Sequence, residues 1–215
     1  MERVICLIIG YAFGLFQTAF IYGKLHGIDI REHGSGNAGT TNTLRVLGTK
    51  AGLIVLAGDI IKCILAIVIS GLIFGVSHPD EIYLLKLYAA AGAILGHNFP
   101  FYLHFRGGKG IAATAGLILS FHIAFLPMGV IIFFGTFFLT HYVSLGSLLV
   151  YAGLMIEMVV VGQTGLFGAS QAVLNEMYIV TALLTILAYY KHRENIGRLL
   201  KGTERKTYLT KKNKE

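Results

Sequence analysis

The sequence contains little charge and few cysteines or prolines. Only 13% of its 215 residues are Asp, Glu, Lys or Arg, whereas a soluble domain carries roughly 25%. Together with 55% hydrophobic residues and a mean hydropathy of +0.69, this excludes an ordinary soluble domain. Cys6 and Cys63 both lie in apolar runs, so no disulfide framework is expected. Three prolines and no low-complexity tract leave no linker, and the length suits a single domain over 1–215.

Several signatures of catalysis and metal binding are also missing. No histidine is followed by aspartate five positions later, so the His-x4-Asp signature of glycerolipid acyltransferases with soluble donors is absent. Neither CxxC nor HExxH occurs, so we expect no metal and no other cofactor. The glycine-rich segment RGGKG at 106–110 has no Ser or Thr after Lys109. It is therefore not a Walker loop, and nucleotide hydrolysis is disfavoured.

The apolar residues form runs of membrane-spanning length, which needs about 20 residues each. The interval 111–143 is too long for one ordinary span and is interrupted by Ser120, His122, Pro127 and Gly129, so we expect two short spans that meet near Phe125. The resulting prediction is an all-α bundle of seven transmembrane helices. The other five runs cover roughly 4–23, 51–76, 82–103, 145–166 and 173–190.

The basic residues support a count of seven. They form three groups, which follow the first span (24–50), the third span (106–109) and the last span (191–215). With seven spans all three groups lie on one face, which the positive-inside rule makes cytoplasmic, and the N-terminus lies outside. The basic tail, 191–215, has no interleaved aromatic pattern of the kind that binds single-stranded nucleic acid. We therefore expect it to contact anionic membrane lipids rather than nucleic acid.

The first polar segment, GSGNAGTTNTLR at 34–45, lies between two long apolar runs. Gly34, Gly36 and Gly39 permit the positive φ values that turn successive backbone amides inward around an anion. Its Ser, Thr and Asn side chains add neutral donors, and Arg45 adds a permanently charged fork suited to phosphate. The alternative is a flexible loop without a ligand. The density of donors favours a phosphate site.

The second polar segment is RGGKG at 106–110. Lys109 is a point charge, and we expect the backbone amides of Gly107, Gly108 and Gly110 to be exposed beside it. The alternative for Arg106 and Lys109 is that they only follow the positive-inside rule. The glycines around Lys109 favour binding.

The third segment is HRENIGRLLKGTERK at 192–206. His192 and Asn195 are three residues apart and share a face on a helical turn. Histidine carries protons near neutral pH, and asparagine can hold a hydroxyl or an oxyanion. Alternatively, His192 only closes the last helix as a C-terminal cap. We expect Arg193, Arg198 and Lys201 to touch lipid headgroups.

Further polar residues lie within or beside the apolar runs. Asp59 and Lys62, at i and i+3, predict a structural ion pair on one helix face. Glu157 has no evident local partner. Ser144 and Ser147 begin the sixth span at the same face as the glycine segments, where either can add a hydroxyl to the site or cap the helix.

Four segments together resemble the motifs of a known family: GSGNAGTTNTLR, GHNFPFYLHFRGGKGIAATAG (96–116), YVSLGS (142–147) and HRENIGRLLKGTE (192–204). They are similar, in order and over nearly the whole chain, to the bacterial acyl-phosphate:glycerol-3-phosphate acyltransferases of the PlsY family. The resemblance implies a multi-pass enzyme of the bacterial cell membrane with its site at the cytoplasmic face. It implies acyl transfer from acyl phosphate to the sn-1 hydroxyl of glycerol 3-phosphate, which gives lysophosphatidic acid and phosphate. It also implies no acyl-CoA, acyl carrier protein or metal, and a soluble partner, PlsX, that makes the donor.

The resemblance also implies roles for individual residues. Ser35 and its neighbours Gly34, Gly36, Asn37, Thr41 and Asn42 would hold the phosphate of the acyl phosphate. Arg45 and Lys109, with Gly107 and Gly108, match positions that bind substrate phosphates. His192 and Asn195 match a polar pair at the last helix, and Ser147, with Ser144, matches a serine of the family. The predicted catalytic set is Ser35, Lys109, His192 and Asn195. Arg106 stands where a lysine is common.

Two questions stay open at the level of sequence. Acyl phosphate is already activated, so no acyl-enzyme is needed, but either His192 or a substrate phosphate can take the proton of the attacking hydroxyl. A transporter of a phosphorylated metabolite would also place phosphate-binding loops near a membrane. The glycine segments lie at span ends and on one face, which favours chemistry at the surface. Clustered His192, Asn195, Ser35 and Lys109 argue against a non-catalytic lipid-binding scaffold.

Overall fold

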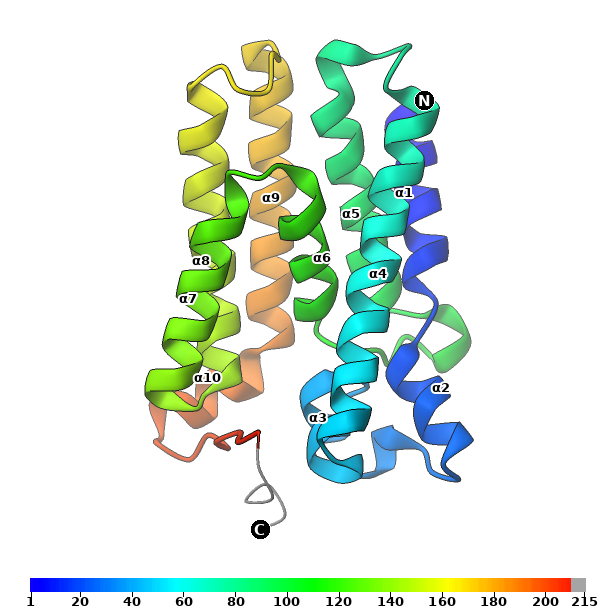
Figure 1. The fold of residues 1–215 in the computed structure, drawn as a ribbon, viewed down its shortest axis with the longest axis vertical. Helices are drawn as coiled ribbons and strands as arrows, with labels where there is room; N and C mark the ends of the chain where they lie inside the picture. The colour runs from blue at the N-terminus through cyan, green and yellow to red at the C-terminus, as the bar shows by residue number, and fades with distance from the viewer. Residues whose placement is uncertain (210–215) are drawn as a thin grey trace.

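The computed structural model describes residues 1–209, and residues 210–215 of the predicted basic tail lie outside the described residues. The described chain is a helical bundle without a strand, as predicted (Figure 1). Its α-helices are α1 (Glu2–Gly14), α2 (Thr18–Leu25), α3 (Thr40–Leu47), α4 (Thr49–Phe74), α5 (Ile82–Asn98), α6 (Ile111–Phe121), α7 (Phe125–Thr140), α8 (Val143–Gln163), α9 (Gln171–Lys191) and α10 (Arg193–Leu200). Three short 3-10 helices are η1 (Ile30–Glu32), η2 (Pro79–Glu81) and η3 (Phe101–Leu103).

Four stretches of the described chain are long and apolar enough to cross a membrane: Glu2–Leu25, Thr49–Phe74, Val143–Gln163 and Gln171–Lys191. The predicted division of 111–143 is confirmed, because α6 ends at Phe121 and α7 begins at Phe125. The 11 residues of α6 rise only about 16 Å, roughly half of a 30 Å hydrocarbon core. The turn between α6 and α7 accordingly lies well inside the upper ends of α8 and α9 (Figure 1).

The first apolar run departs from the expected continuous helix. The helix stops after Gly14 and resumes at Thr18. Three side chains donate to the carbonyls freed by the break. Gln17, within the break, bonds Gly14, and Tyr102 and Lys62, from distant segments, bond Leu15 and Phe16. Broken helices are tolerated inside membrane proteins where other groups satisfy the backbone in this way. Leu15 and Phe16 are apolar, so the break left no mark on the hydropathy profile.

Helices α1 and α5 approach each other through glycines. Gly10 and Gly14 on α1 face Gly92 and Gly96 on α5, and a Cβ at any of the four would collide with the backbone of the opposite helix. This is small-xxx-small packing on both helices, which lets two membrane helices come into backbone contact. The contact fixes the position at which α5 ends, close to the break between α1 and α2.

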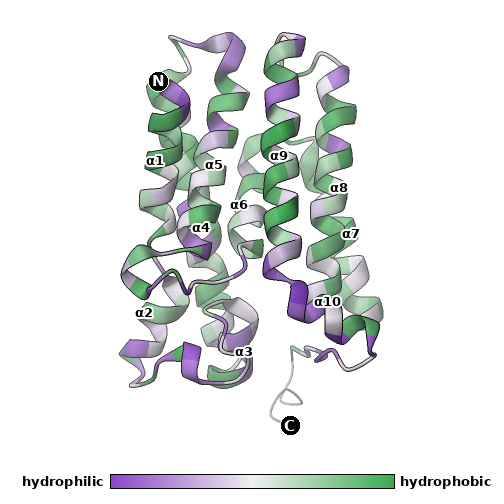
Figure 2. Ribbon diagram, turned by 180° about the vertical axis from the view of Figure 1, so that it is seen from behind, coloured by the Kyte–Doolittle hydropathy of each residue, from purple (hydrophilic) through white to green (hydrophobic). Residues whose placement is uncertain are grey.

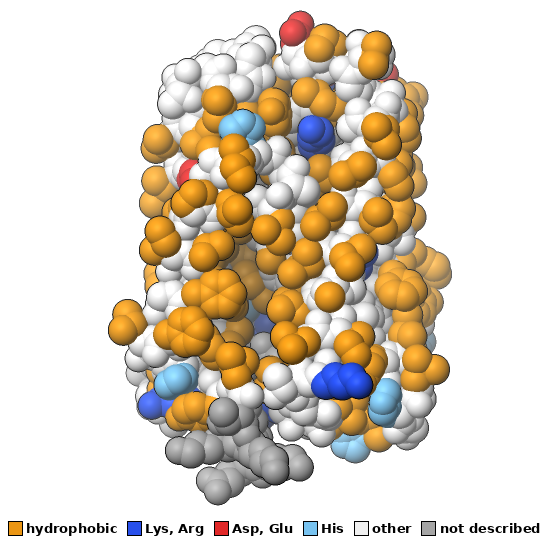
Figure 3. Space-filling view, in the orientation of Figure 1, with side chains coloured by type: hydrophobic (Ala, Val, Ile, Leu, Met, Phe, Trp, Pro, Cys, Tyr) orange, Lys and Arg blue, Asp and Glu red, His pale blue; other side chains and the backbone are white. Residues whose placement is uncertain are grey.

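The two ends of the bundle differ in character. The N-terminus lies at the upper end in Figure 1, and α2, α3, α10 and the last described residues lie at the lower end. Polar segments occupy the ends, while the middle of the long helices is apolar (Figure 2). On the face seen in Figure 3, apolar side chains cover most of the height, and Lys, Arg and His side chains lie mainly near the lower end, with others near the upper end. Within residues 1–209, the three basic groups share the lower end, as predicted.

Candidate active site

A cleft of about 490 Å³ opens at the lower end and brings the predicted polar segments together. Its walls come from four segments, 34–45, 107–112, 143–147 and 191–205, together with Asp59 and His97. Of the predicted site residues, all but one line it: Gly34, Ser35, Gly36, Asn37, Thr41, Asn42, Arg45, Gly107, Lys109, Ser144, Ser147, His192 and Asn195. Gly108 does not line it. Segments up to 160 residues apart in sequence meet here, since Arg45 bonds Arg205 across that separation.

Four helices begin at the cleft. The first residues of α3 (Thr40, Thr41), α6 (Ile111, Ala112), α8 (Val143, Ser144) and α10 (Arg193, Glu194) all line it. The first amides of a helix have no partner within the helix, and each N-terminus carries a partial positive charge. The cleft therefore combines four positive helix ends, an arrangement suited to phosphate groups. The sequence analysis identified the loops but not this convergence of helix ends.

Asn42 organises the loop that carries Ser35. Its Oδ1 accepts from the amide of Ser35 at 2.8 Å, and its Nδ2 donates to the carbonyls of Ile30 and His33 at 3.0 and 2.9 Å. The Asn42 amide group is thus already used within the protein, although it lines the cleft. Gly34 and Gly36 adopt the predicted positive φ, of 61° and 70°. The same prediction is wrong for Gly39, whose φ of −159° is extended and lets it precede α3.

The glycines beside Lys109 act differently from the prediction of exposed amides. The amides of Gly107 and Gly108 donate to the carbonyls of Asn98 and His97, at 3.3 and 3.1 Å. A Cβ at Gly107 would collide with the His97 carbonyl, and one at Gly108 would collide with the His97 ring. These two glycines therefore allow the loop to lie directly on the end of α5. Gly110, with a φ of 86°, then turns the chain into α6.

Lys109 and Arg45, the two cations of the predicted site, have only neutral hydrogen-bond partners among the described residues. Lys109 donates to Oδ1 of Asn195. Arg45 donates to Oγ1 of Thr207 at 2.7 Å and to the Arg205 carbonyl at 3.3 Å. Burial, with the nearby charge of Arg198, lowers the pKa of Lys109 to about 8, and burial also lowers the pKa of Arg45. Burial makes the charge of each group costly, and a bound anion would offset that cost.

His192 is neutral at pH 7. Burial lowers its pKa to about 4; its bond to the Ala188 carbonyl opposes this shift, and the charge of Lys109 adds to it. Nδ1 lies 2.8 Å from that carbonyl oxygen. A carbonyl only accepts, so Nδ1 carries the ring proton and Nε2 is left with a free lone pair. The helix-capping alternative accounts for Nδ1, and Nε2 remains available to a ligand.

Glu204 is a member of the site that the sequence analysis did not select. Its carboxylate accepts from Asn195 Nδ2 (2.7 Å), Ser144 Oγ (2.9 Å) and Arg198 Nε (2.7 Å). Burial would raise the pKa of Glu204, but these hydrogen bonds outweigh it and hold the pKa below its usual value. Arg198 was expected at lipid headgroups; it pairs with Glu204 instead. Glu204 lies in the segment HRENIGRLLKGTE, but no feature of that segment predicts its contacts with Asn195, Ser144 and Arg198.

The remaining predicted residues behave more simply. Ser147 donates to the Val143 carbonyl of its own helix at 2.8 Å. The Asp59–Lys62 ion pair is confirmed, with 2.8 Å between Nζ and Oδ1. Glu157 Oε2 is buried and has no hydrogen-bond partner among the described residues.

Comparisons with known proteins agree with this geometry. The family model of glycerol-3-phosphate acyltransferases matches residues 4–202. The chain is 41% identical to the glycerol-3-phosphate acyltransferase of Bacillus subtilis strain 168 over 208 residues, which cover 96% of this chain and 98% of the relative. It is 40% identical to that of Bacillus cytotoxicus over 211 residues, which cover 97% and 96% of the two chains.

Solved structures show the same fold. The crystal structure of PlsY, an integral membrane glycerol 3-phosphate acyltransferase, in its glycerol 3-phosphate form matches with a TM-score of 0.82 and 28% identity. The match covers 97% of this chain and 96% of that one. The lysophosphatidic acid form of PlsY matches with a TM-score of 0.79 and 27% identity, and covers 97% of both chains. The chain is an integral membrane protein that belongs to the glycerol-3-phosphate acyltransferase family.

Proposed function

We propose that the chain transfers a fatty acyl group from acyl phosphate to the sn-1 hydroxyl of glycerol 3-phosphate in the bacterial cell membrane. The products are lysophosphatidic acid and inorganic phosphate, in the first acylation of phospholipid biosynthesis. One observation carries the proposal: four helix N-termini and the charges of Arg45 and Lys109 meet in one cleft at the end of an apolar bundle. Glycerol 3-phosphate is a phosphate ester and acyl phosphate is a mixed anhydride, so each substrate carries a phosphate group. Helix N-termini and cationic side chains are groups that bind phosphate.

The proposed topology follows from the same end of the molecule. Seven helices, namely α1 with α2, α4, α5, α6, α7, α8 and α9, pass through the membrane, with α6 and α7 as a short pair. The end with the cleft carries the basic groups and therefore faces the cytoplasm, and the N-terminus lies outside. A soluble acyl-phosphate-producing enzyme, PlsX, then supplies the donor from the cytoplasmic side.

The reaction needs no acyl-enzyme. The hydroxyl oxygen of glycerol 3-phosphate forms a bond to the carbonyl carbon of the donor, and the bond from that carbon to the phosphate oxygen breaks. Arg45 and Lys109 offset the repulsion between the two anions, and the loop at Ser35 stabilises the departing phosphate. Holding the hydroxyl beside the carbonyl supplies an orientation effect that can reach roughly 7–11 kcal/mol.

The low pKa of His192 favours a substrate phosphate as the acceptor of the hydroxyl proton. With a pKa of about 4, His192 is a poor proton acceptor. A phosphate monoester, whose second pKa is about 6, is the better one. His192 therefore orients the hydroxyl through a hydrogen bond to Nε2, with Asn195 beside it, and a substrate phosphate takes the proton.

The test is phosphate release by the purified protein in lipid bilayers. The protein is given palmitoyl phosphate with and without glycerol 3-phosphate, and palmitoyl-CoA replaces palmitoyl phosphate as a control donor. We expect release that requires glycerol 3-phosphate, yields lysophosphatidic acid and fails with the CoA ester. Intact mass should show no acyl adduct on Ser35 during turnover.

The opposite results lead elsewhere. Turnover with palmitoyl-CoA would overturn the proposed donor, and a stable acyl adduct on Ser35 would indicate a covalent mechanism. If a folded sample shows no turnover, the result favours the transporter alternative, which is then tested by measuring uptake of phosphate esters into vesicles.

A further inference from the structure

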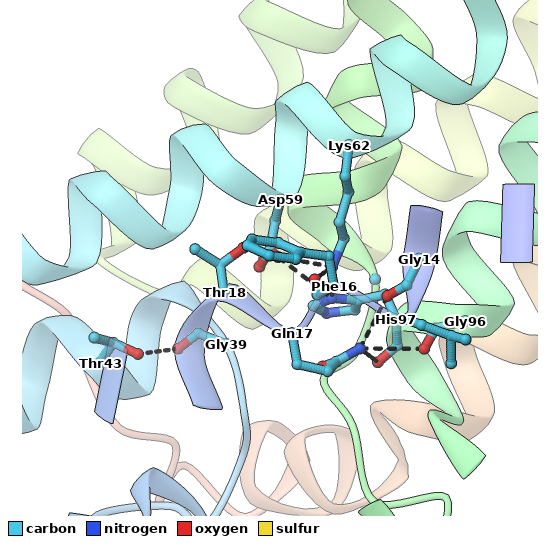
Figure 4. A network of polar contacts seen from close by, with 12 residues as sticks. Gly14, Phe16, Gln17, Thr18, Gly39, Thr43, Asp59, Lys62, Gly96 and His97 are labelled. Carbon is cyan, nitrogen blue, oxygen red and sulfur yellow. Dashed lines mark hydrogen bonds and ion pairs between the residues drawn. The ribbon is translucent and has the colours of Figure 1, made fainter. Parts of the chain in front are cut away.

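A buried polar cluster forms the inner wall of the cleft and has no part in the function proposed above. Asp59 and Lys62 on α4 and His97 at the end of α5 are each no more than 3% exposed (Figure 4). Asp59 and His97 also line the cleft. The cluster therefore connects the interior of the bundle to the place where the substrates are proposed to bind.

Lys62 determines which nitrogen of His97 carries the ring proton. Its Nζ lies 2.8 Å from Asp59 Oδ1, 2.8 Å from the Phe16 carbonyl and 2.9 Å from Nδ1 of His97. An ammonium group has three donors and no acceptor, so Nδ1 must accept. The competing contact, from Nδ1 to Asp59 Oδ1, is 3.6 Å and too long for a hydrogen bond. A neutral ring with a bare Nδ1 carries its proton on Nε2.

That N–H lies between the two glycine segments. A Cβ at Gly108 would collide with Nε2 of His97 and would approach the Ala38 carbonyl oxygen to 2.8 Å. The side-chain amide of Gln17 holds the backbone at this point, donating to the carbonyls of Gly96 and His97 at 3.1 and 3.2 Å (Figure 4). Among the described residues, no hydrogen bond to Nε2 of His97 occurs. The cleft thus contains a fixed neutral donor beside the loop of Lys109.

His192, which also lines the cleft, has the reverse arrangement. Its Nδ1–H is held by the Ala188 carbonyl, and its Nε2 is a bare acceptor. Two histidines in one cleft are therefore set to opposite tautomers by the partners behind them. Lys62, a donor, makes His97 a donor toward the cleft, and Ala188, an acceptor, makes His192 an acceptor.

We infer that His97 and His192 are a complementary pair, in which Nε2–H of His97 donates to a substrate phosphate oxygen and Nε2 of His192 accepts from the attacking hydroxyl. Lys62 is the positioning residue for His97. Its charge also neutralises Asp59, which would otherwise repel an anion at this wall. The roles in acyl transfer rest on the proposed function, while the two tautomers do not.

The tautomers are testable in the wild-type protein without turnover. The 15N spectrum of histidine-labelled protein in lipid nanodiscs distinguishes a protonated ring nitrogen from a bare one. At pH 7 we expect His97 to carry its proton on Nε2 and His192 on Nδ1, with assignments from His97→Gln and His192→Gln. Inorganic phosphate should then shift the Nε2–H signal of His97. The same tautomer at both rings, or no response of His97 to phosphate, would overturn the inference.

The positioning role of Lys62 has its own readout. Lys62→Met removes the donor that faces Nδ1 and leaves Asp59 as the nearest polar group. We expect the proton of His97 to move to Nδ1 and the response to phosphate to disappear. If the folded variant keeps the wild-type tautomer of His97, the positioning role of Lys62 is contradicted.

Kinetics separate a substrate contact from a structural role. We expect His97→Phe, which keeps a ring but has no donor, to reduce kcat/KM about tenfold, the loss of one hydrogen bond to a charged group, with intact membrane insertion. His78→Phe, at the far end of the bundle, is the matched control and should leave kcat/KM unchanged. Equal rates in His97→Phe and the wild type would contradict the contact. If the two histidines have opposite tautomers and His97 responds to phosphate, but the protein shows no acyl transfer, only the proposed function is contradicted.

Discussion

Arg3 at the upper end of this bundle and Arg45 and Lys109 at the lower end have hydrogen-bond partners of opposite character. At the upper end, the Arg3 guanidinium bonds Glu176 at 2.7 and 2.9 Å and Glu81 at 3.2 Å, and Tyr88 also bonds Glu176. At the lower end, Arg45 and Lys109 bond only neutral groups, a hydroxyl, a carbonyl and an amide oxygen.

The difference separates a structural cation from a binding cation. Two carboxylates compensate the charge of Arg3, which joins α1 to η2 and α9. Its guanidinium donors are used by these carboxylates and not by a ligand. The charges of Arg45 and Lys109 are uncompensated by their direct partners, and burial makes that charge costly until an anion arrives. Residue type does not distinguish the two cases, since an arginine occurs in each; the chemistry of the partner does.

The largest expected effect comes from removing the lower cations. Lys109→Ala and Arg45→Ala should each reduce kcat/KM by at least about 100-fold, because a charge that stabilises the transition state is lost. Membrane insertion and helix content should persist, which circular dichroism of the purified variants checks. Near-wild-type turnover in either variant would contradict the assignment of that residue as a binding cation.

Gly108→Ala should reduce turnover about 10- to 100-fold, since a displacement of about 1 Å at a reacting group has consequences of that order. The added methyl group would collide with the ring of His97 and force the Lys109 loop away from α5. Gly197→Ala on α10 is the matched control, because a Cβ there meets nothing within 4 Å. Steady-state rates of both variants decide the matter, and equal rates would contradict the close packing of this loop.

A smaller effect concerns pH. Lys109 is charged below its pKa of about 8 and loses its charge above it. The value of kcat/KM, which reports the free enzyme, should therefore fall as the pH rises through 8. Lys109→Arg should flatten that alkaline limb, since arginine stays charged over this range. A limb at the same pH in Lys109→Arg would assign it to another group.

The smallest effect on activity is expected at the upper end. Arg3→Met removes the bonds to Glu81 and Glu176 and should cost about 1–2 kcal/mol of stability, a modest value because these side chains are about one third exposed. The melting temperature should fall while KM changes by less than about twofold, since no substrate contact is lost. A large KM change would mean that the two ends are coupled.

Composition and apolar runs of membrane-spanning length predicted the class of fold, and interruptions in the apolar pattern predicted the division of 111–143. The break at Leu15–Gln17 could not be predicted, because its carbonyls are satisfied by Lys62 and Tyr102 from distant segments. A hydropathy profile reports how each residue partitions between water and an apolar environment. It carries no information on which distant side chains will hydrogen-bond to the backbone at that point.

The same limit applies to the site. Motif residues identified the walls of the cleft, since glycines, hydroxyls and cations are local signals. The two glycine segments look alike in sequence yet differ in structure. Gly34 and Gly36 shape the loop of Ser35 with positive φ values, whereas Gly107 and Gly108 give their amides to α5. His97 was missed because its role depends on Lys62, which lies on another helix. Glu204 was missed because nothing in the sequence shows that the chain after α10 folds back onto Asn195, Arg198 and Ser144.

The most direct measurement is equilibrium binding of glycerol 3-phosphate by calorimetry to the wild type, Lys109→Met and Arg3→Met in the same detergent. The account predicts that Lys109→Met weakens binding at least about tenfold, the loss of a charge-assisted hydrogen bond. It predicts that Arg3→Met binds within about twofold of the wild type, because a cation already compensated by carboxylates adds nothing to an anion site. Equal losses in the two variants, or full binding in Lys109→Met, would contradict the claim that the uncompensated cations of the lower end form the phosphate site.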